Sequence, residues 1–393
     1  MSKWKMVRLG DVCEIVLGST PKTNVDEYWN GEIKWITPAE IEENAHFISD
    51  TERHLTELGR KSAGLRIMPR GTVLLSTRAP IGKVAIISEE MCCNQGFKNF
   101  ICSPEIHNNY IYYFLKNKTE YLNSLGNGAT FKEISKKIVE EIKIPLPPLD
   151  EQKRIADVLD KASELIKKRK EQIRLMDELA KSLFIEMFGD PVENPMGWTL
   201  YLIKDLANPE KNSIKAGPFG SSLKKEFYVT QGYKIYGQEQ VISGDIDFGD
   251  YYISEDKYLE LKSYSIKEND VLISLVGTYG KLLIIPHIFR LGIINPRLMK
   301  VSFDLKRIMP IYFKFFFESE SLKKSLAEKS HGGTMDILNV GIIKMINIPL
   351  PPLSLQQEFA DRINAIEQQK ALLQNGLAKM ETAYKALMQE YFG

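Results

Sequence analysis

Polar and basic side chains gather in short loops that separate apolar, β-branched runs of the chain. In the first half these loops are residues 17–24, 76–83 and 93–99. Arg, Lys, Asn, Gln, Ser and Thr are the side chains that hydrogen-bond phosphate oxygens and the base edges of a DNA duplex. The candidates for such contacts in this half are Thr20, Lys22, Arg78, Lys83, Asn94, Gln95, Lys98 and Thr130.

Loops of the same composition recur in the second half, at residues 214–225, 236–240, 277–281 and 295–300. Their candidates are Lys215, Ser221, Lys224, Tyr236, Gln238, Lys281, Arg297 and Thr334. One such loop alone is more often a solvated turn. Because the loops occupy matching places in the two halves, the sequence favours contact with nucleic acid and the solvated-turn interpretation about equally.

Residues typical of catalytic or metal sites form no recognisable pattern. The sequence has no G-x-x-x-x-G-K-[ST], no G-x-G-x-x-G that opens a helix and no H-E-x-x-H. Its five histidines do not cluster, and its four cysteines contain no C-x-x-C pair, so we expect reduced thiols. We therefore predict no catalytic residue, no metal and no cofactor, which favours a binding protein. An enzyme with an unrecognised site stays open as an alternative.

Length and charge limit the architecture and the partners. At 393 residues the chain exceeds the ~250–300 residues of a single core, so two or more domains are expected. Lys plus Arg is 52 and Asp plus Glu is 51, which gives a formal net charge of +1. An anionic partner must therefore meet local basic patches rather than a global positive field.

Two segments bear on membrane and targeting interpretations. The first residues lack the apolar stretch of a signal peptide, so we expect a cytoplasmic protein. Residues 271–289 lack acidic side chains and could mimic a membrane span. Gly277, Gly280, Lys281 and Pro286 interrupt them, however, so we predict a β-hairpin around the G-T-Y-G turn.

The chain repeats itself once. IPLPPL occurs at residues 144–149 and again at 348–353, an offset of 204 residues. Within the loops, Ser76 matches Ser274 and Asn94 matches Asn295, with offsets of 198 and 201. Two copies of about 200 residues are therefore predicted, each with a variable body, a proline-rich entry and a fixed terminal segment.

The terminal segment of each copy is predicted to be a long helix. Apolar residues recur at spacings of four and three from residue 155 to 187 and from 359 to 391, with one polar interruption in each seam, Arg169 and Lys370. This heptad pattern predicts a coiled coil in which the two helices pair antiparallel. Asp150 and Ser354 are the expected N-caps, and Gly189 ends the first helix. The alternative is two unrelated helices, each packed on its own body.

The remaining runs mix short β-rich stretches, turns and apolar helical segments, which predicts α+β bodies with irregular sheets. The whole layout then resembles a known family, the specificity subunit of Type I restriction–modification systems. The residues that carry this resemblance are IPLPPLDEQKRIADVLDKASELI, its second copy IPLPPLSLQQEFADRINAIEQQ, GTVLLSTRAPIGKVAI and NQGFK. The second copy reads SLQQEF where the first reads DEQKRI, which leaves the helical register intact.

The resemblance implies two pseudo-repeated α/β target recognition domains, 1–149 and 190–353, separated by two spacer helices, 150–189 and 354–393. Each domain would read one half of a split double-stranded DNA sequence, and the antiparallel coiled-coil helices would set the unread gap. Two modification (methyltransferase) subunits, which carry S-adenosylmethionine, and restriction (motor–nuclease) subunits would be the partners. The subunit itself would catalyse nothing. The alternative is a coiled-coil adaptor that gathers proteins without base-specific DNA reading.

Overall fold

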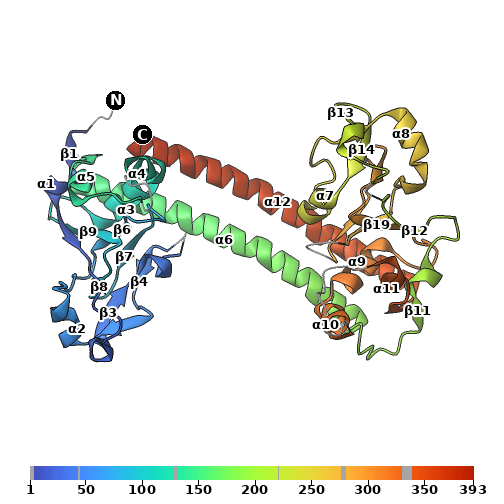
Figure 1. The fold of residues 1–393 in the computed structure, drawn as a ribbon, viewed down its shortest axis with the longest axis horizontal. Helices are drawn as coiled ribbons and strands as arrows, with labels where there is room; N and C mark the ends of the chain where they lie inside the picture. Colours follow the sequence, from blue (N-terminus) through green and yellow to red (C-terminus); the bar gives the residue numbers. More distant parts are fainter. Residues whose placement is uncertain (1–3, 43–44, 127–131, 220, 276–279, 330–338) are drawn as a thin grey trace. The chain divides into compact units, whose positions relative to one another are not determined.

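The computed structural model describes residues 4–42, 45–126, 132–219, 221–275, 280–329 and 339–393 (Figure 1). The chain divides into two compact units: Met1–Glu171 with Asn375–Gly393, and Gln172–Gln374. Each unit therefore contains one body and parts of both long helices, α6 (Leu149–Phe188) and α12 (Leu353–Phe392). We refer to the bodies, without the long helices, as the first and second body.

The first body is built around a five-stranded sheet. Its order is β2 (Cys13–Leu17), β9 (Phe97–Cys102), β6 (Val73–Ser76), β7 (Val84–Ile87) and β4 (Phe47–Ile48). A second sheet contains β5 (Arg53–Leu55), β3 (Trp29–Ile36) and β8 (Cys92–Cys93), and β1 (Met6–Arg8) pairs with β10 (Lys143–Pro145). The helices are α1 (Leu9–Val12), α2 (Glu57–Ser62), α3 (Asn108–Asn117), α4 (Thr119–Leu125) and α5 (Lys136–Glu140).

The second body repeats this plan. One sheet has the order β12 (Ile214–Ala216), β19 (Leu298–Val301), β16 (Val271–Ser274) and β17 (Leu282–Ile284). The other has the order β13 (Tyr228–Val229), β15 (Tyr252–Ile253), β14 (Tyr233–Tyr236) and β18 (Gly292–Ile294), and β11 (Leu200–Leu202) pairs with β20 (Asn347–Pro349). The helices are α7 (Gln238–Ser243), α8 (Glu255–Glu260), α9 (Pro310–Glu318), α10 (Glu320–Lys329) and α11 (Val340–Lys344).

Equivalent strands pair in the same sense in the two bodies. The hairpin β6–β7 corresponds to β16–β17, and the parallel pair β3–β8 corresponds to β14–β18. Strands β6, β7 and β16 are buried along their whole length, so apolar runs rather than alternation mark them in the sequence. The predicted α+β class and the internal repeat are both confirmed.

The apolar stretch 271–289 forms the predicted hairpin. Val271 lies opposite Ile284 and Ile273 opposite Leu282 in an antiparallel ladder, while the tip, residues 276–279, lies outside the described residues. Within the described part of the chain, no helix is both long enough and apolar enough to cross a membrane.

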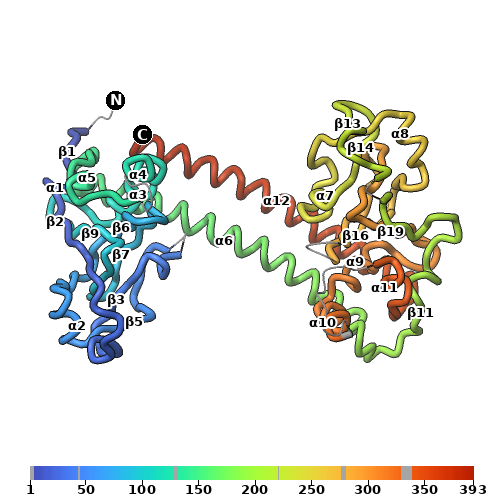
Figure 2. The backbone as a smooth tube through the Cα atoms, viewed as in Figure 1, coloured from blue at the N-terminus to red at the C-terminus, as the bar shows by residue number. Residues whose placement is uncertain are grey.

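The long helices run antiparallel within each unit. In the first unit, the start of α6 and the end of α12 lie beside the same body (Figure 2). There Ile155 and Leu159 of α6 share a core with Met388 and Phe392 of α12. All the seam positions predicted from the heptad pattern are buried or half-buried. The predicted pairing is therefore confirmed, and the alternative of two helices that never meet is wrong.

The second unit shows the same arrangement with the helix ends exchanged. Phe184 and Phe188 at the end of α6 pack on Phe359 near the start of α12, with ring centroids 5.7 and 5.2 Å apart. The polar seam residue Lys370 forms an ion pair with Asp177 of α6. Each helix therefore starts in one body's core and ends in the other's.

The helix starts differ from the prediction by one residue. The amides of Gln152 and Gln356 donate to the carbonyls of Pro148 and Pro352, at 3.0 and 3.2 Å. Asp150 and Ser354 therefore lie inside the first turn and are not N-caps, because the proline-rich entry itself supplies the first accepting carbonyl. Gly189, at φ 77°, ends α6 as predicted.

A buried glutamine fixes each long helix to its body. Gln152 is fully buried, and its Nε2 donates to the carbonyls of Glu105 and Pro147, both at 2.9 Å, while its Oε1 accepts from the amide of His107 at 2.8 Å. Gln356 makes the equivalent bonds to Arg307, Pro351 and Met309 in the second unit. These contacts set the angle at which each helix leaves its body.

Candidate nucleic-acid interface

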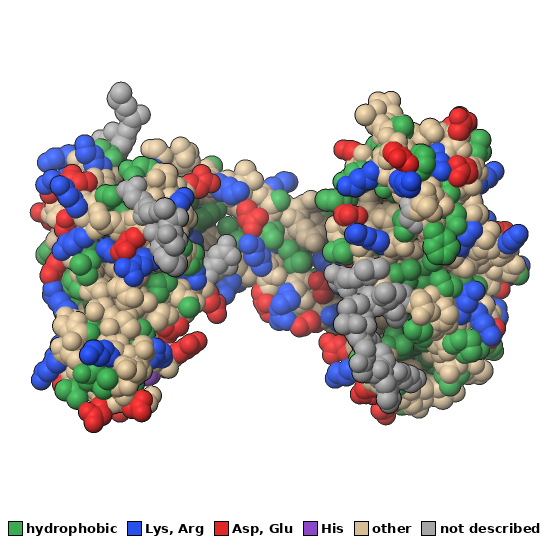
Figure 3. Space-filling view, in the orientation of Figure 1, with side chains coloured by type: hydrophobic (Ala, Val, Ile, Leu, Met, Phe, Trp, Pro, Cys, Tyr) green, Lys and Arg blue, Asp and Glu red, His purple; other side chains and the backbone are tan. Residues whose placement is uncertain are grey.

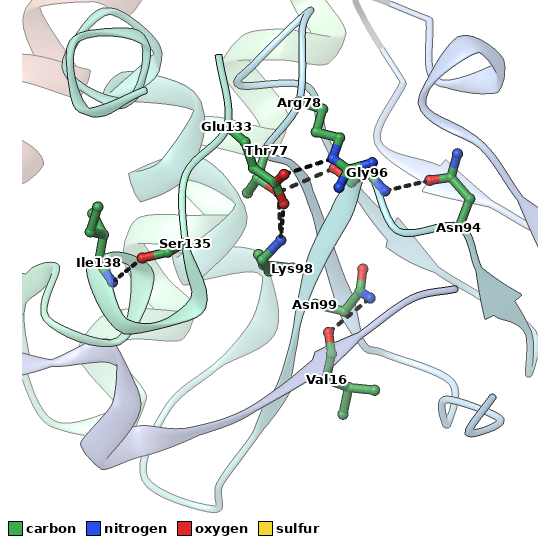
Figure 4. A network of polar contacts seen from close by, with 10 residues as sticks. All are labelled: Val16, Thr77, Arg78, Asn94, Gly96, Lys98, Asn99, Glu133, Ser135 and Ile138. Atoms are coloured by element: carbon green, nitrogen blue, oxygen red, sulfur yellow. Dashed lines mark hydrogen bonds and ion pairs between the residues drawn. The ribbon is translucent and has the colours of Figure 1, made fainter. Parts of the chain in front are cut away.

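Three loops of the first body meet where β2, β6 and β9 end or begin (Figure 4). The amide of Ser19 donates to the carbonyl of Cys93 at 3.0 Å, and the amide of Thr77 donates to the carbonyl of Gly96 at 2.8 Å. Ile134 joins them, because its amide donates to the carbonyl of Thr77 at 3.0 Å. We call the surface formed by residues 17–24, 76–83, 93–98 and 133–134 the first loop surface.

Glycine permits the closest approach between these loops. A Cβ on Gly18 would lie 1.9 Å from the carbonyl oxygen of Asn94. In the second body, a Cβ on Gly217 would lie 1.8 Å from the carbonyl oxygen of Asn295. No side chain fits at either position without moving backbone, so the two bodies use the same loop-to-loop contact.

The second body forms an equivalent second loop surface from residues 214–225, 274–281 and 295–298, where residues 220 and 276–279 are outside the described part. The amide of Ser274 donates to the carbonyl of Lys281 at 3.1 Å, as that of Ser76 does to Lys83 at 2.8 Å. The side-chain oxygen of Asn295 accepts the amide of Arg297 at 2.9 Å. The loop pairs matched in the sequence are thus structural equivalents.

The predicted contact residues differ widely in exposure. Thr130 and Thr334 lie outside the described residues. Those with exposed side chains are Lys22, Arg78, Gln95, Ser221, Lys224, Lys281 and Arg297. Those half-buried are Thr20, Lys83, Asn94 and Lys215, and those buried are Lys98, Tyr236 and Gln238.

Two of the half-buried lysines fasten loops to their neighbours. The Nζ of Lys83 donates to the carbonyls of Pro38 and Ile41, at 3.0 and 2.7 Å. The Nζ of Lys215 donates to the Oγ of Ser263 at 2.6 Å and lies 4.0 Å from the ring centre of Tyr264. Both ammonium groups already have partners within the protein, so a DNA contact would have to compete with these interactions.

The buried candidates in the second body support the loops from beneath. The Tyr236 hydroxyl donates to the carbonyl of Arg290 at 2.5 Å, and burial raises the pKa of this phenol. The Nε2 of Gln238 donates to the Oγ of Ser274 at 2.7 Å. Gln238 therefore holds Ser274 and Tyr236 holds the segment that contains Arg290, and neither side chain projects from the surface.

Other candidates contact side chains of their own loop surface or close to it. The hydroxyl of Thr20 donates to Oε1 of Gln95, which links two loops of the first surface. In the second body, Lys224 lies 3.5 Å from the carboxylate of Glu226, an exposed pair that water screens strongly. Basic and acidic side chains are interspersed over the visible face of each unit, in keeping with the balanced net charge (Figure 3).

An acidic residue that the sequence analysis missed lies at the centre of the first loop surface. Glu133 Oε2 accepts from Nε of Arg78 at 2.8 Å, and its Oε1 accepts from Nζ of Lys98 at 3.1 Å (Figure 4). Although partial burial opposes ionisation, the hydrogen bonds from Lys98 and Arg78 lower the pKa of Glu133. Glu133 is far from both cations in the sequence and has no motif, so only the fold reveals this contact.

Comparisons with known proteins fit this geometry. The family model described as Type I restriction modification DNA specificity domain matches residues 1–175 and 195–382, one match for each copy. The MjaIX specificity subunit of a Type I restriction enzyme from Methanocaldococcus jannaschii is 30% identical over 381 residues, covering 91% of this chain and 85% of that protein. The EcoKI specificity subunit from Escherichia coli K12 is 24% identical, covering 83% and 75%.

Solved structures show the same fold. The S subunit of a Type I restriction–modification system from M. genitalium matches with a TM-score of 0.58 at 15% identity, covering 100% of this chain and 96% of that one. A chain from a structure of a type I R-M system, described in terms of complex assembly and conformational transition, gives a TM-score of 0.59 at 19% identity, covering 99% and 97%. Because the family model matches both copies and the M. jannaschii relative is 30% identical, the chain belongs to the family of Type I restriction–modification specificity subunits.

Proposed function

We propose that this chain is the sequence-specific DNA-binding subunit of a Type I restriction–modification complex. The observation that carries the proposal is the pair of bodies with equivalent loop geometry and different loop residues. Both loop surfaces combine hydrogen-bonded loops with exposed Arg and Lys side chains, joined by Gln95 in the first body and Ser221 in the second, which is the chemistry of groove and phosphate contacts. Since the residues differ between bodies, the two half-sites they read differ in sequence.

The exposed candidates are proposed as the DNA contacts. In the first body these are Lys22, Arg78 and Gln95, assisted by Thr20 and Asn94 of the same loop surface. In the second body they are Ser221, Lys224, Lys281 and Arg297. The more buried candidates, Lys83, Lys98, Lys215, Tyr236 and Gln238, are proposed to keep these contacts in position.

The long helices are proposed to set the gap between the half-sites. Each contains 40 residues, about 60 Å at 1.5 Å per residue. In this proposal residues 1–149 and 190–353 are the recognition domains, and 150–189 and 354–393 are the spacer helices. The proposal is supported by the continuous heptad seam and by the buried glutamines that fix each helix to its body.

The chemistry of modification and cleavage is proposed to reside in partner subunits. Two modification subunits, which supply S-adenosylmethionine and methyl transfer, and restriction subunits with motor and nuclease activity would assemble on this chain. The specificity subunit itself would catalyse nothing. The support for this is the family membership together with a sequence that carries no recognisable catalytic motif.

Mapping of methylated bases tests the function directly. A host that expresses this chain with its modification subunits should methylate a split motif, two different short words separated by a fixed unread gap. The same host without this chain should not methylate that motif. A single continuous word would contradict the two-reader arrangement, and no DNA preference at all would favour the adaptor alternative.

A further inference from the structure

We propose that Glu133 is a positioning residue for specificity: it aims the guanidinium of Arg78 at a guanine of the first half-site, and buried Lys98 holds its carboxylate in place. This inference rests on the proposed function and assigns one base contact within it. It gives Lys98 and Glu133, neither of which reaches the DNA in this scheme, a defined effect on the sequence that is read.

The contact with Glu133 leaves Arg78 in a suitable state for end-on recognition. Its Nε donates to Glu133 Oε2 at 2.8 Å, and the side chain is 44% exposed. Among the described residues, no group accepts a hydrogen bond from the two terminal nitrogens of Arg78. These two nitrogens can donate together to O6 and N7 of one guanine, which is the commonest specific contact of arginine.

Holding Arg78 before DNA arrives also lowers the entropic cost of the contact. A long side chain that is free in solution loses rotamer freedom when it binds. Here the backbone is fixed as well, because the amide of Ile134 donates to the carbonyl of Thr77 and Arg78 forms a β-bridge with Glu133. The Arg78 side chain is thus held at its backbone and at its Nε.

Lys98 explains why Glu133 stays in position. Its side chain is only 7% exposed, and its Nζ bonds Glu133 Oε1 at 3.1 Å and Thr77 Oγ1 at 3.3 Å. A buried ammonium needs a charged partner, so Oε1 of Glu133 stays bonded to Lys98 whether or not DNA is bound. Lys98 on β9 therefore holds Glu133 in place, and Glu133 in turn holds Arg78.

The charge of Glu133 has a second consequence. A carboxylate at a surface that meets DNA repels phosphates, so it disfavours any register in which Arg78 would bind the backbone instead of a base. Removing this charge should therefore lower discrimination while leaving non-specific affinity equal or higher. A purely structural role for Glu133 predicts the opposite, a loss of affinity for every sequence.

Within the described residues, the ammonium that holds Glu133 in the first body has no counterpart in the second body. Lys98 lies opposite Leu75 in the β6–β9 ladder, and the equivalent partner of Ile273 in the β16–β19 ladder is Met299. The second body therefore has no ammonium at this position. The second half-site consequently serves as an internal control within the same molecule.

The test is Glu133→Gln in the complete methyltransferase complex, read out by methylation mapping and by binding to duplexes with each base of the first half-site varied. One G·C pair of the first half-site should lose discrimination by roughly tenfold, within the ~5- to 150-fold that a bidentate pair supplies. The second half-site should be read unchanged. Arg78→Ala should relax the same base pair, and the double variant should add nothing further.

Glu141→Gln is the matched control, because Glu141 also pairs with an arginine of the first body, Arg8, at 3.2 Å. It should leave both half-sites unchanged. If Glu133→Gln disturbs folding, Lys98→Met combined with Glu133→Gln removes both charges and should relax the same base pair. Equal weakening of all sequences, or unaltered discrimination, would overturn the inference. A wild-type complex without a split motif would instead refute the proposed function.

Discussion

At the scale of single residues, the two bodies place different side chains at one equivalent pair of buried positions. In the second body Lys300 and Asp270 form a buried pair, with Nζ and Oδ2 3.7 Å apart, and Ser302 donates to Asp270 Oδ1 at 2.5 Å. Burial raises the pKa of Asp270 and lowers that of Lys300, so neither charge is well tolerated without the other. The equivalent positions of the first body hold the uncharged Thr72 and Asn99.

We expect Asp270→Asn to destabilise the second unit by about 3–5 kcal/mol, because it leaves the Lys300 ammonium buried without a counter-charge. The double change Asp270→Thr with Lys300→Asn, which copies the first body, should cost clearly less than the single change. Urea unfolding of the three proteins measures the difference. A double variant as unstable as Asp270→Asn would show that the pair itself, rather than the orphaned charge, provides the stability.

A second residue-scale prediction concerns acid stability. His46 stacks between Phe47 and Tyr112, with ring centroids 4.3 and 4.2 Å away, and its Nδ1 lies 3.6 Å from Asp160 of α6. Burial lowers the pKa of His46, and Lys116 adds to this, while Asp160 and Asn109 oppose it. The folded state therefore binds fewer protons than the unfolded state below the ordinary histidine pKa of about 6.5.

Because the unfolded state takes up the extra proton, the free energy of unfolding should fall as pH drops through about 6.5 and level off below the folded-state pKa. His46→Gln should lower the number of protons taken up on unfolding by up to one, which flattens the dependence of the free energy of unfolding on pH. Denaturant unfolding between pH 5 and 7.5 measures it. His107, whose pKa burial also lowers, should keep part of the slope in the variant, and an unchanged slope would exclude His46 as a source.

At the scale of elements, the junction between body and helix depends on one glutamine in each unit. Gln356→Leu should destabilise the protein by about 1–3 kcal/mol for each buried group left unpaired, here the carbonyls of Arg307 and Pro351 and the amide of Met309. Gln357→Leu is the matched control, since its exposed side chain bonds only Asp361 among the described residues. Thermal unfolding of the two variants should differ clearly, and equal effects would contradict the proposed role of the junction.

The long-period patterns of the sequence predicted these elements well. The heptad seam gave the pairing of both helices, and the repeated IPLPPL segments marked the entries, because periodicity and proline report local geometry directly. The N-caps were wrong by two residues, since the carbonyls of Pro148 and Pro352 accept the first helical bonds, from the amides of glutamines whose side chains are held by distant loops. The difference between DEQ and SLQ in the two copies is harmless because both keep that glutamine.

The candidate site was less predictable for the same reason. Composition identified the loops and their matching positions, but exposure depends on tertiary contacts: Lys98 and Tyr236 are buried, and Glu133 is brought to Arg78 from another part of the chain. The amino-acid composition of a loop indicates which contacts the loop can make. It does not indicate which of its side chains are exposed.

At the scale of the whole molecule, the helices are proposed as a ruler, and paired deletions test it. Removing one heptad at facing positions of α6 and α12 shortens each helix by about 10 Å and rotates its faces by only about 20°, so the seam is kept. The methylated motif should keep both words with a gap shorter by about three base pairs, at 3.4 Å per pair.

Deleting five residues at the same positions is the control, because it rotates the faces by about 140° and turns the apolar seam outward. Methylation should then be lost rather than respaced. Methylation mapping distinguishes these outcomes. An unchanged gap after the heptad deletion would show that the helices do not determine the spacing.

The exchange of helix ends also has a consequence for biosynthesis. The ring of Phe392 lies 5.2 Å from that of Tyr110, and Met388 belongs to the same core, so the first unit is closed by residues that are synthesised after the whole second body. Until then a nascent chain carries an open apolar face on α3 for as long as the second body takes to emerge. Such an intermediate is a natural client for a chaperone, and stalled translation products would aggregate through that face.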